Sequence, residues 1–354
     1  MKIYQKNGYL DAAHIEEVAD KNGIAFVAII GKRQIGKTYN VLKHMLDNDR
    51  RFIFMRRVRA EMEMLESDVN SPFEAIRDYA GLIKFRHESQ YTAAIERLDR
   101  IPQDTNDKPE AVRIGTGVAL STVGNIRGFN GSLYSDLVFD EFIPEEQLYK
   151  VRNEGDAFLN AYTTINGNRE IDEEAPRPPL RVWLLANSNN LDSGILDALN
   201  ITRDVERMSI RGDEVRILPE RHIMILLPDS TAITEKRKRG VLYEAIDKES
   251  DFAKMAYENK FSYNDYTDVV TVNLREYNVL AHYGKMTIHL HKNAKRVFVS
   301  DRIAGKARHE YRDTEYYQNK FIREFPDLRP AFLSGHVGFS SMRIKAYFIR
   351  ALRL

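Results

Sequence analysis

The sequence predicts an α/β protein in which a parallel sheet carries helices on both faces. Short runs of nearly continuous β-branched and aromatic residues alternate with stretches of helical pattern, as expected for a buried parallel sheet. The expected strands are Ile24–Ile30, Phe52–Arg56, Leu137–Asp140 and Arg181–Ala186. The expected helices are Lys37–Asn48, Pro72–Tyr79 and Glu154–Ile165.

A change of pattern near residue 230 predicts a second, smaller α+β domain. Charged residues of helical pattern run from Thr234 to Asn259, and from about Tyr266 apolar and polar residues alternate. Gly284 stands where a hairpin turn is expected, and a helical tail begins at Arg343. We therefore expect one domain at 1–228, a helical linker at 229–265 and a second domain at 266–354.

The composition limits the classes of partner. The 354 residues include 53 basic and 52 acidic side chains and no cysteine, which excludes disulfides and thiolate metal sites. A constitutive, tight nucleic-acid binder usually has a strong basic excess, so any contact with a polyanion must come from local clusters. The longest apolar runs are too short to cross a bilayer, and we expect no membrane partner.

The stretch GKRQIGKT, from Gly31 to Thr38, fits the phosphate-loop pattern G-x-x-x-x-G-K-[ST]. The backbone N–H groups of such a loop surround phosphate oxygens, Lys37 would reach the β- and γ-phosphates, and Thr38 would bind Mg²⁺. An ordinary glycine-rich turn is the alternative. The expected nucleotide-binding residues are Gly31, Lys32, Arg33, Gln34, Ile35, Gly36, Lys37, Thr38 and Tyr39.

Two further strands end in polar residues that would complete such a site. In SDLVFDEF, Asp140 would hold Mg²⁺ through water and Glu141 would act as the general base on the attacking water. The carboxyl end of a strand is where ligands bind in open α/β sheets. In VWLLANSNN, Asn187 and Ser188 either sense the γ-phosphate or cap the next segment.

With these residues, the chain resembles the genome-packaging ATPases of small tailed phages with protein-capped linear DNA, which are compact relatives of the large terminase subunit. The resemblance spans nearly the whole chain and depends on GKRQIGKTYN, RFIFMRRVRAEME, SDLVFDEFIPE, FLNAYTTINGNRE and LLANSNN. It implies a P-loop ATPase of the ASCE type that uses ATP and Mg²⁺. Such a protein works as a homo-oligomeric ring, typically of five subunits, and drives double-stranded DNA through the portal of an empty procapsid.

The resemblance also implies where the protein works and with what. It would act in the host cell cytoplasm, join the procapsid transiently and be absent from the mature virion. A scaffold RNA is a further partner that the sequence leaves open. The rival hypotheses are a helicase-like ATPase that remodels nucleic acid, and an assembly protein that binds ATP as a switch without turnover.

In such rings an arginine from the neighbouring subunit completes each site. Here Gly167 stands where the first of two family arginines would be, so Arg169 is the expected finger and Arg152 its rival. Other basic residues match family positions near DNA or nucleotide, or are ordinary exposed side chains. These residues are Arg56, Arg57, Arg127, Lys236, Arg237, Lys238 and Arg239.

For the second domain, the resemblance implies an RNase H-like fold. A nuclease of that fold needs clustered carboxylates to hold two metal ions. The first hairpin, NVLAHYGKMTIHLH, has no acid on either strand, and Asp301 has no evident partner. We therefore expect a domain without nuclease activity that docks and handles DNA. His289 and His291 share a strand face and are expected to be ordinary strand residues.

Overall fold

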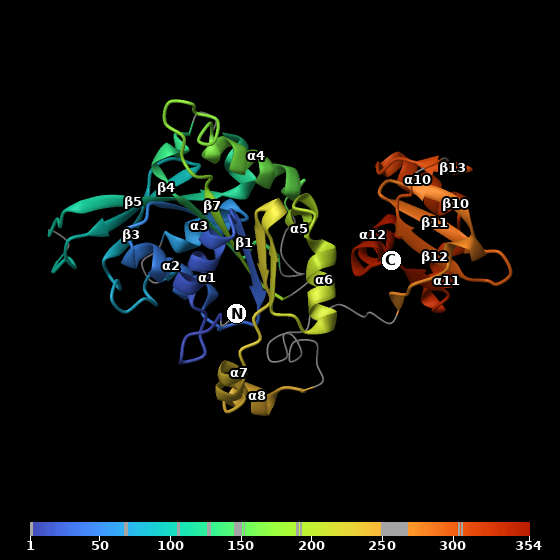
Figure 1. Ribbon diagram of the computed structural model, residues 1–354, viewed down its shortest axis with the longest axis horizontal. Coiled ribbons are helices and arrows are strands. Elements are labelled where there is room, and N and C mark those ends of the chain that lie inside the picture. Colours follow the sequence, from blue (N-terminus) through green and yellow to red (C-terminus); the bar gives the residue numbers. More distant parts are fainter. Residues whose placement is uncertain are drawn as a thin grey trace. The chain divides into compact units, whose positions relative to one another are not determined.

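The computed structural model describes residues 3–66, 70–104, 107–125, 129–144, 151, 153–188, 191, 193–248, 268–303, 305 and 307–354. The chain forms two compact units, Met1–Ser262 and Tyr263–Leu354, which are described separately (Figure 1). The first unit therefore extends beyond the expected boundary at 228. Of the expected linker, residues 229–248 contain α7 (Thr231–Arg237) and α8 (Val241–Ala245), and residues 249–265 lie outside the described ranges.

The described part of the first unit is built on a nine-stranded sheet in the order β3-β4-β5-β2-β6-β7-β1-β9-β8. The strands are β1 (Phe26–Gly31), β2 (Phe52–Arg56), β3 (Ile83–His87), β4 (Thr92–Leu98), β5 (Ala111–Ala119), β6 (Asp136–Asp140), β7 (Arg181–Asn187), β8 (Val215–Leu218) and β9 (Ile223–Leu226). Six neighbouring strands in this order, β5, β2, β6, β7, β1 and β9, pair in parallel. This parallel centre confirms the predicted fold class.

Both edges of this sheet are antiparallel, which the sequence pattern did not indicate. β4 pairs antiparallel with β3 and with β5, and β8 pairs antiparallel with β9. These edge strands are only partly buried, so they lack the continuous apolar character by which the central strands are recognised. The sheet is therefore mixed, with a parallel centre.

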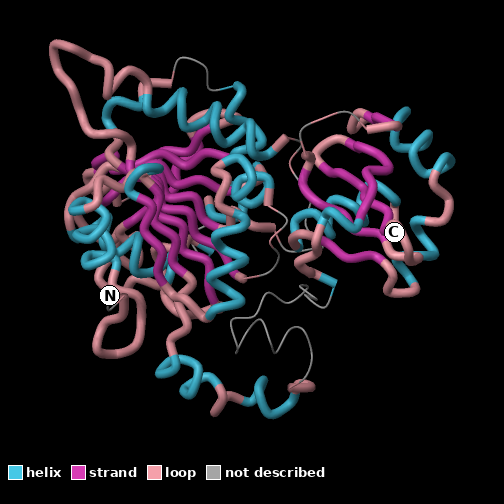
Figure 2. The backbone as a smooth tube through the Cα atoms, turned by 45° about the vertical axis from the view of Figure 1, so that its right-hand side comes forward, coloured by secondary structure: helices cyan, strands magenta, loops and turns pink. Residues whose placement is uncertain are grey.

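Helices cover the two faces of the sheet, as Figure 2 shows. Alternate residues of a strand point to opposite faces, so Val27 and Ile29 of β1 join the core on one side. That core also contains buried residues of α1 (Ala12–Lys21), α2 (Lys37–Asp47) and α3 (Arg59–Leu65). On the other side, Phe158 of α4 (Glu154–Asn166) packs against Phe139, with ring centroids 6.1 Å apart. The short α5 (Gly194–Ala198) contacts α4, and α6 (Thr202–Arg211) follows it.

The predicted helix at Pro72–Tyr79 is wrong: this segment is a series of turns. Ile76 N–H donates to the Phe73 carbonyl at 2.9 Å and Tyr79 N–H to the Ile76 carbonyl at 2.8 Å, so each bond spans three residues. Phe73 and Ile76 are fully buried at the same spacing of three. A three-residue spacing fits successive tight turns as well as a helix, which is why the pattern misled.

The second unit, in its described part, has a five-stranded sheet in the order β13-β10-β11-β12-β14. Its strands are β10 (Tyr277–Tyr283), β11 (Met286–His291), β12 (Val297–Asp301), β13 (His309–Tyr311) and β14 (Val337–Phe339), and its helices are α10 (Glu315–Glu324), α11 (Leu328–Leu333) and α12 (Met342–Leu352). The expected hairpin turn at Gly284 is present, with a φ of 48°. The RNase H-like assignment stays a prediction.

The polar residues singled out in this unit have local partners. Arg343 lies 3.6 Å from Asp301, and the buried His289 contacts the hydroxyl of Ser300 at 2.9 Å. Burial, and then the neighbouring His282, lowers the pKa of His289. Within the described ranges, no three His, Asp or Glu side chains gather closely enough to hold a metal ion. None of the described helices is both long and apolar enough to span a bilayer.

Candidate nucleotide site

The loop between β1 and α2 adopts a conformation that its glycines permit. Gly36 caps α2 with a φ of 82°, and a Cβ there would lie 2.3 Å from Asn40 Nδ2. A Cβ on Gly31 would lie 2.9 Å from both Ile35 and Pro228. Both positions therefore require glycine, one for its backbone angle and space and the other for space alone.

Lys37 is buried within this loop. Its ammonium donates to the carbonyls of Gly31 at 3.0 Å and Lys32 at 2.7 Å, and to Asn187 Oδ1 at 3.0 Å. Burial lowers the pKa of Lys37 to about 7, although Asp140 and Glu141 oppose the shift. The loop thus carries an ammonium whose charge is held by neutral oxygens, and which an incoming anion would stabilise.

Thr38 and Asp140 meet at the carboxyl end of the sheet. The Thr38 hydroxyl donates to Asp140 Oδ1 at 2.8 Å, although the two residues are 102 positions apart in the chain. Asp140 is buried, and burial raises the pKa of its carboxyl, opposed chiefly by Arg56. A hydroxyl and a carboxylate are the oxygen ligands that Mg²⁺ takes in nucleotide sites.

Glu141, the next residue, has a strained backbone and an accessible side chain. Its φ is 56°, in the left-handed region that non-glycine residues rarely occupy, and such strain is concentrated at functional sites. Its side chain is 49% exposed, so its carboxylate can reach a water molecule. Arg56 Nη1 lies 2.5 Å from Glu141 Oε2, while Nη2 of the same guanidinium lies 3.1 Å from Asp140.

These contacts test whether the residues fit a magnesium nucleotide. The guanidinium of Arg56 places a positive charge beside Asp140 and Glu141, where a divalent cation would bind. The glycine loop leads into α2, whose N-terminus favours phosphate. The donor set therefore fits ATP with Mg²⁺: Lys37 for phosphate, and Thr38 and Asp140 for the metal ion.

The structure brings together five of the predicted residues, namely Lys37, Thr38, Asp140, Glu141 and Asn187. Ser188 follows Asn187 and is buried, with a hydroxyl that has no hydrogen-bond partner among the described residues. Within the loop, Gln34 has a φ of 63°, and the side chain of Ile35 is buried in the core. Tyr39 is exposed at the start of α2.

Arg57 and Arg169 both face the protein interior, which corrects the prediction for Arg57. Arg57 is 1% exposed and its Nε lies 2.7 Å from Glu154 Oε1, so it is not a surface contact for DNA. Arg169 is 4% exposed and donates to the carbonyls of Gly131, at 2.6 Å, and Tyr134. In this conformation the Arg169 guanidinium is engaged within its own subunit, and its role as the finger toward a neighbouring subunit stays a prediction. Arg127 and Arg152 lie outside the described residues.

The basic cluster 236–239 belongs to a segment that packs on the phosphate loop. Arg237 donates to the carbonyl of Arg33 at 3.1 Å, and Lys236 to that of Asn7 at 3.3 Å. Lys238 pairs with Glu235 at 3.1 Å, and Arg239 follows the end of α7. Three of these four side chains are therefore engaged within the unit, and the DNA contacts of the cluster stay predictions.

Sequence reasoning missed the contact between this segment and Lys32. The buried Lys32 ammonium donates to Thr234 Oγ1 at 2.9 Å and forms an ion pair with Asp229. The residue pairs are about two hundred positions apart, and no local pattern links them. We refer to residues 229–237, with these contacts to Lys32 and Arg33, as the loop tether.

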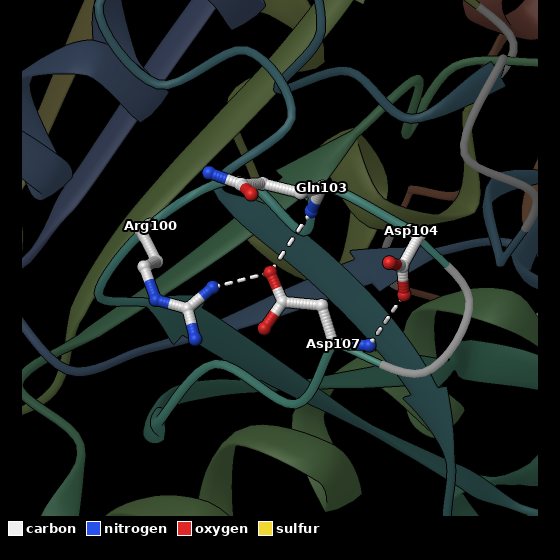
Figure 3. A pocket seen from close by; sticks show the side chains of 4 residues that line it. All are labelled: Arg100, Gln103, Asp104 and Asp107. Carbon is white, nitrogen blue, oxygen red and sulfur yellow. Dashed lines mark hydrogen bonds and ion pairs between the residues drawn. The ribbon is translucent and has the colours of Figure 1, made fainter.

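A hollow at the tip of the β4–β5 connection is a less convincing site. Figure 3 shows its lining residues, Arg100, Gln103, Asp104 and Asp107. Asp107 accepts hydrogen bonds from Arg100 and from the Gln103 N–H, and its own N–H donates to Asp104 at 3.0 Å. Because these groups bond to one another, the hollow is a structured turn.

Comparisons with known proteins agree with this geometry at the level of the fold. No protein-family model matches the chain, and no curated protein matches it. A chain of the phage Phi-28 gp11 DNA packaging motor is 17% identical, with a TM-score of 0.60, and a chain of the bacteriophage Phi-29 viral genome packaging motor assembly is 17% identical, with a TM-score of 0.62. Each comparison covers 99% of both chains. Over its whole length, this chain therefore has the fold of chains from phage DNA packaging motors.

Proposed function

We propose that this protein is an ATPase that drives double-stranded viral DNA into an empty procapsid through the portal. The observation that carries the proposal is the joint placement of Lys37, Thr38, Asp140 and Glu141 at one edge of the sheet. The likeness to packaging-motor chains over 99% of this chain supports the coupling of that site to DNA movement. The reaction would be hydrolysis of ATP to ADP and phosphate.

Each residue of the site would have a distinct task. Lys37 would exchange its bonds to the loop carbonyls for bonds to the β- and γ-phosphates. Thr38 and Asp140 would hold Mg²⁺, which supplies charge neutralisation on the phosphate oxygens. Glu141, with its exposed carboxylate, would accept a proton from the attacking water. Arg56 must first withdraw from both carboxylates.

Asn187 would report the nucleotide state. Its side-chain oxygen now accepts from Lys37, a bond that competes with the phosphates for the same ammonium. Phosphate binding would release Asn187 at the end of β7, next to the unpartnered hydroxyl of Ser188. This is a physical route from the phosphates to the neighbouring strand, without any change in the sheet itself.

The assembly is also a proposal. As the resemblance implies, the protein would form a homo-oligomeric ring, typically of five subunits, on the portal, and the use of a scaffold RNA stays open. The net charge of +1 suits a motor that holds DNA through phosphates and releases it at every step. It would work in the host cell cytoplasm, on the procapsid only during packaging, and would be absent from the mature virion.

One reconstitution tests the proposal. Purified protein, ATP, duplex DNA and empty procapsids are mixed, and the DNA that becomes protected from nuclease is measured. We expect ATP-dependent protection that disappears with Glu141→Gln. Stimulation of hydrolysis by single-stranded DNA, in preference to duplex, would favour the helicase-like alternative. ATP binding without turnover would favour the assembly switch.

A further inference from the structure

A second cavity lies at the opposite end of the strands from the nucleotide site. It has a volume of about 360 Å³ and is lined by residues that precede β6 and begin β7, including Ser135 and Arg181. Asp140 and Asn187, at the other ends of these two strands, belong to the nucleotide site. The two sites are therefore separated by the length of the strands.

The wall of this cavity carries more positive than negative charge. Its charged residues are Glu16, Asp20, Arg50, Arg169, Arg177 and Arg181. Both carboxylates already have partners. Arg50 lies 2.7 Å from Glu16, and Arg181 lies 2.5 Å from Asp20. Two guanidiniums therefore remain without a carboxylate among the described residues.

These two guanidiniums belong to Arg169 and Arg177, and both are positioned by the backbone. Arg169 donates to the Gly131 carbonyl at 2.6 Å, and Arg177 donates to the Ser132 carbonyl at 2.8 Å. Burial, and then the charge of Arg177, lowers the pKa of Arg169. Two positive charges thus lie near each other, both hydrogen-bonded to neutral carbonyl oxygens, and Asp136 offsets only part of the shift at Arg169.

Two donors on the cavity wall are buried without an acceptor. Arg169 Nε and Arg181 Nη1 have no hydrogen-bond partner among the described residues. Buried polar atoms without partners are rare, and each one needs an explanation such as a missing ligand or ion. An anion in the cavity would supply acceptors to both.

The rest of the wall is mostly apolar, apart from Ser132 and Ser135, and the cavity is wide enough for more than a bare anion. Leu133, Tyr134, Pro178 and Pro179 line it. The volume of about 360 Å³ falls within the usual range of small-molecule pockets, about 300–1,000 Å³. A phosphate attached to a sugar and a base would use both the guanidiniums and the apolar wall.

We propose that this cavity binds a nucleotide unit, with Arg169 and Arg177 on its phosphate and Tyr134 and Pro179 against its sugar or base. The unit is either a free nucleotide or part of a nucleic-acid strand, since both present the same phosphate chemistry. The proposal goes beyond the ATPase function and does not depend on it, because it uses none of the residues of the phosphate loop.

The first test measures binding of AMP by calorimetry in the full-length Lys37→Ala protein, in which the phosphate loop is disabled. We expect one remaining site. Adding Arg177→Ala should weaken it about tenfold or more, because a hydrogen bond to a charged group is lost. Arg177→Lys, which keeps the charge but loses the planar fork, should weaken it less. Arg207→Ala, at an exposed arginine on α6, is the matched control and should leave AMP affinity unchanged.

The second test repeats the comparison with a short DNA duplex, with folding of each variant checked by circular dichroism. If Arg177→Ala weakens duplex binding and reduces its salt dependence by about one phosphate contact, the unit belongs to nucleic acid. If it weakens AMP binding alone, the ligand is a free nucleotide. Equal affinity of wild-type and Arg177→Ala proteins for both probes would overturn the proposal.

Discussion

Arg56 lies 3.1 Å from Asp140 through one nitrogen of its guanidinium, while the other terminal nitrogen contacts Glu141. The same arginine thus neutralises both acids that a hydrolytic site would use. Arg56 is mostly buried, and Asp140 and Glu141 together raise its pKa despite the opposing effect of burial. In this conformation Arg56 pairs with the carboxylate proposed to hold Mg²⁺, so nucleotide binding would require the arginine to move.

Arg56→Ala should lower the thermal stability of the protein and enlarge the increase in Tm that Mg²⁺ with nucleotide produces. Breaking the pair leaves Asp140 as a buried, uncompensated charge, at a cost of about 2–3 kcal/mol, moderated because Glu141 is half exposed. Mg²⁺ with a slowly hydrolysed ATP analogue should restore the loss. Thermal unfolding with and without this ligand checks the prediction, with Arg86→Ala, an exposed arginine paired with Glu96, as the control. A smaller ligand-induced increase in Tm than in wild type would contradict it.

Lys37→Ala should abolish Mg²⁺-dependent ATP binding at the phosphate loop, because it removes the buried ammonium that the loop carbonyls surround. Calorimetry with Mg·ATP provides the measurement. Lys43→Ala, on the same helix but paired with Asp47 and Asp78 at the surface, is the matched control. Mg²⁺-dependent ATP affinity that survives Lys37→Ala unchanged would show that the phosphate loop does not hold the nucleotide.

Glu141→Gln should bind ATP but hydrolyse it about 10²–10⁴-fold more slowly, the usual range for loss of a general base. The amide keeps the shape of the side chain and loses the proton acceptor. Steady-state ATPase rates and analogue affinity measured on the same preparation separate the two effects. Glu63→Gln, an exposed glutamate of α3, should hydrolyse ATP normally. A Glu141→Gln protein with full turnover would place the base on another residue.

ATP binding should take up a proton at pH 8. The pKa of Lys37 is about 7 in the free protein, so most of the ammonium is neutral at that pH, and phosphate restores its charge. Affinity should therefore fall by up to about tenfold per pH unit above 7. Calorimetry in two buffers of different ionisation enthalpy measures the uptake. Lys37→Arg, always protonated, is the control, and no uptake by the wild-type protein would contradict the shift.

The same pKa has a consequence for the free protein. Between pH 7 and the ordinary lysine pKa of 10.5, the unfolded chain binds more protons at Lys37 than the folded one. The contribution of Lys37 to the free energy of unfolding therefore rises with pH over this window. Comparing denaturant unfolding of wild type and Lys37→Met at pH 7 and pH 9 isolates this contribution.

Arg169→Ala should destabilise the subunit rather than remove a catalytic contact made to a neighbour. The guanidinium is buried and holds two backbone carbonyls, so its loss should cost about 2–4 kcal/mol. Rings that mix Arg169→Ala with Glu141→Gln subunits distinguish the two roles. Activity that scales with the fraction of intact subunits fits a structural role, whereas dependence on neighbour order would support the finger assignment.

Much of the site could be predicted because its residues stand at fixed places on recognisable elements. Gly31 to Thr38 follow an apolar strand and begin a helix, and Asp140 ends another apolar strand. In a parallel sheet the carboxyl ends of such strands meet at one edge, so the pairing of Thr38 with Asp140 follows from topology. The four adjacent strands β2, β6, β7 and β1 were predictable because burial on both faces leaves them almost continuously apolar, whereas the neighbouring parallel strands β5 and β9 were not predicted.

Other features depend on contacts that no local pattern encodes. An arginine that ends a buried strand can turn outward or inward, and Arg56 and Arg57 turn toward different carboxylates, those of Asp140 and Glu154. The burial of Arg169 depends on carbonyls of residues 131 and 134, more than thirty positions earlier. Antiparallel edge strands and tight turns have short, mixed patterns that resemble loops and helices.

The loop tether couples the conformation of the phosphate loop to the position of residues 229–237, because the two segments are joined by side-chain contacts. Lys32 and Arg33 contribute one side of it, and Thr234 and Arg237 the other. If bound phosphates changed the conformation of the phosphate loop, α7 would either move with the loop or lose its hydrogen bonds to Lys32 and Arg33. In a packaging motor made of this chain, hydrolysis of ATP at the loop would thus displace the backbone of residues 229–237.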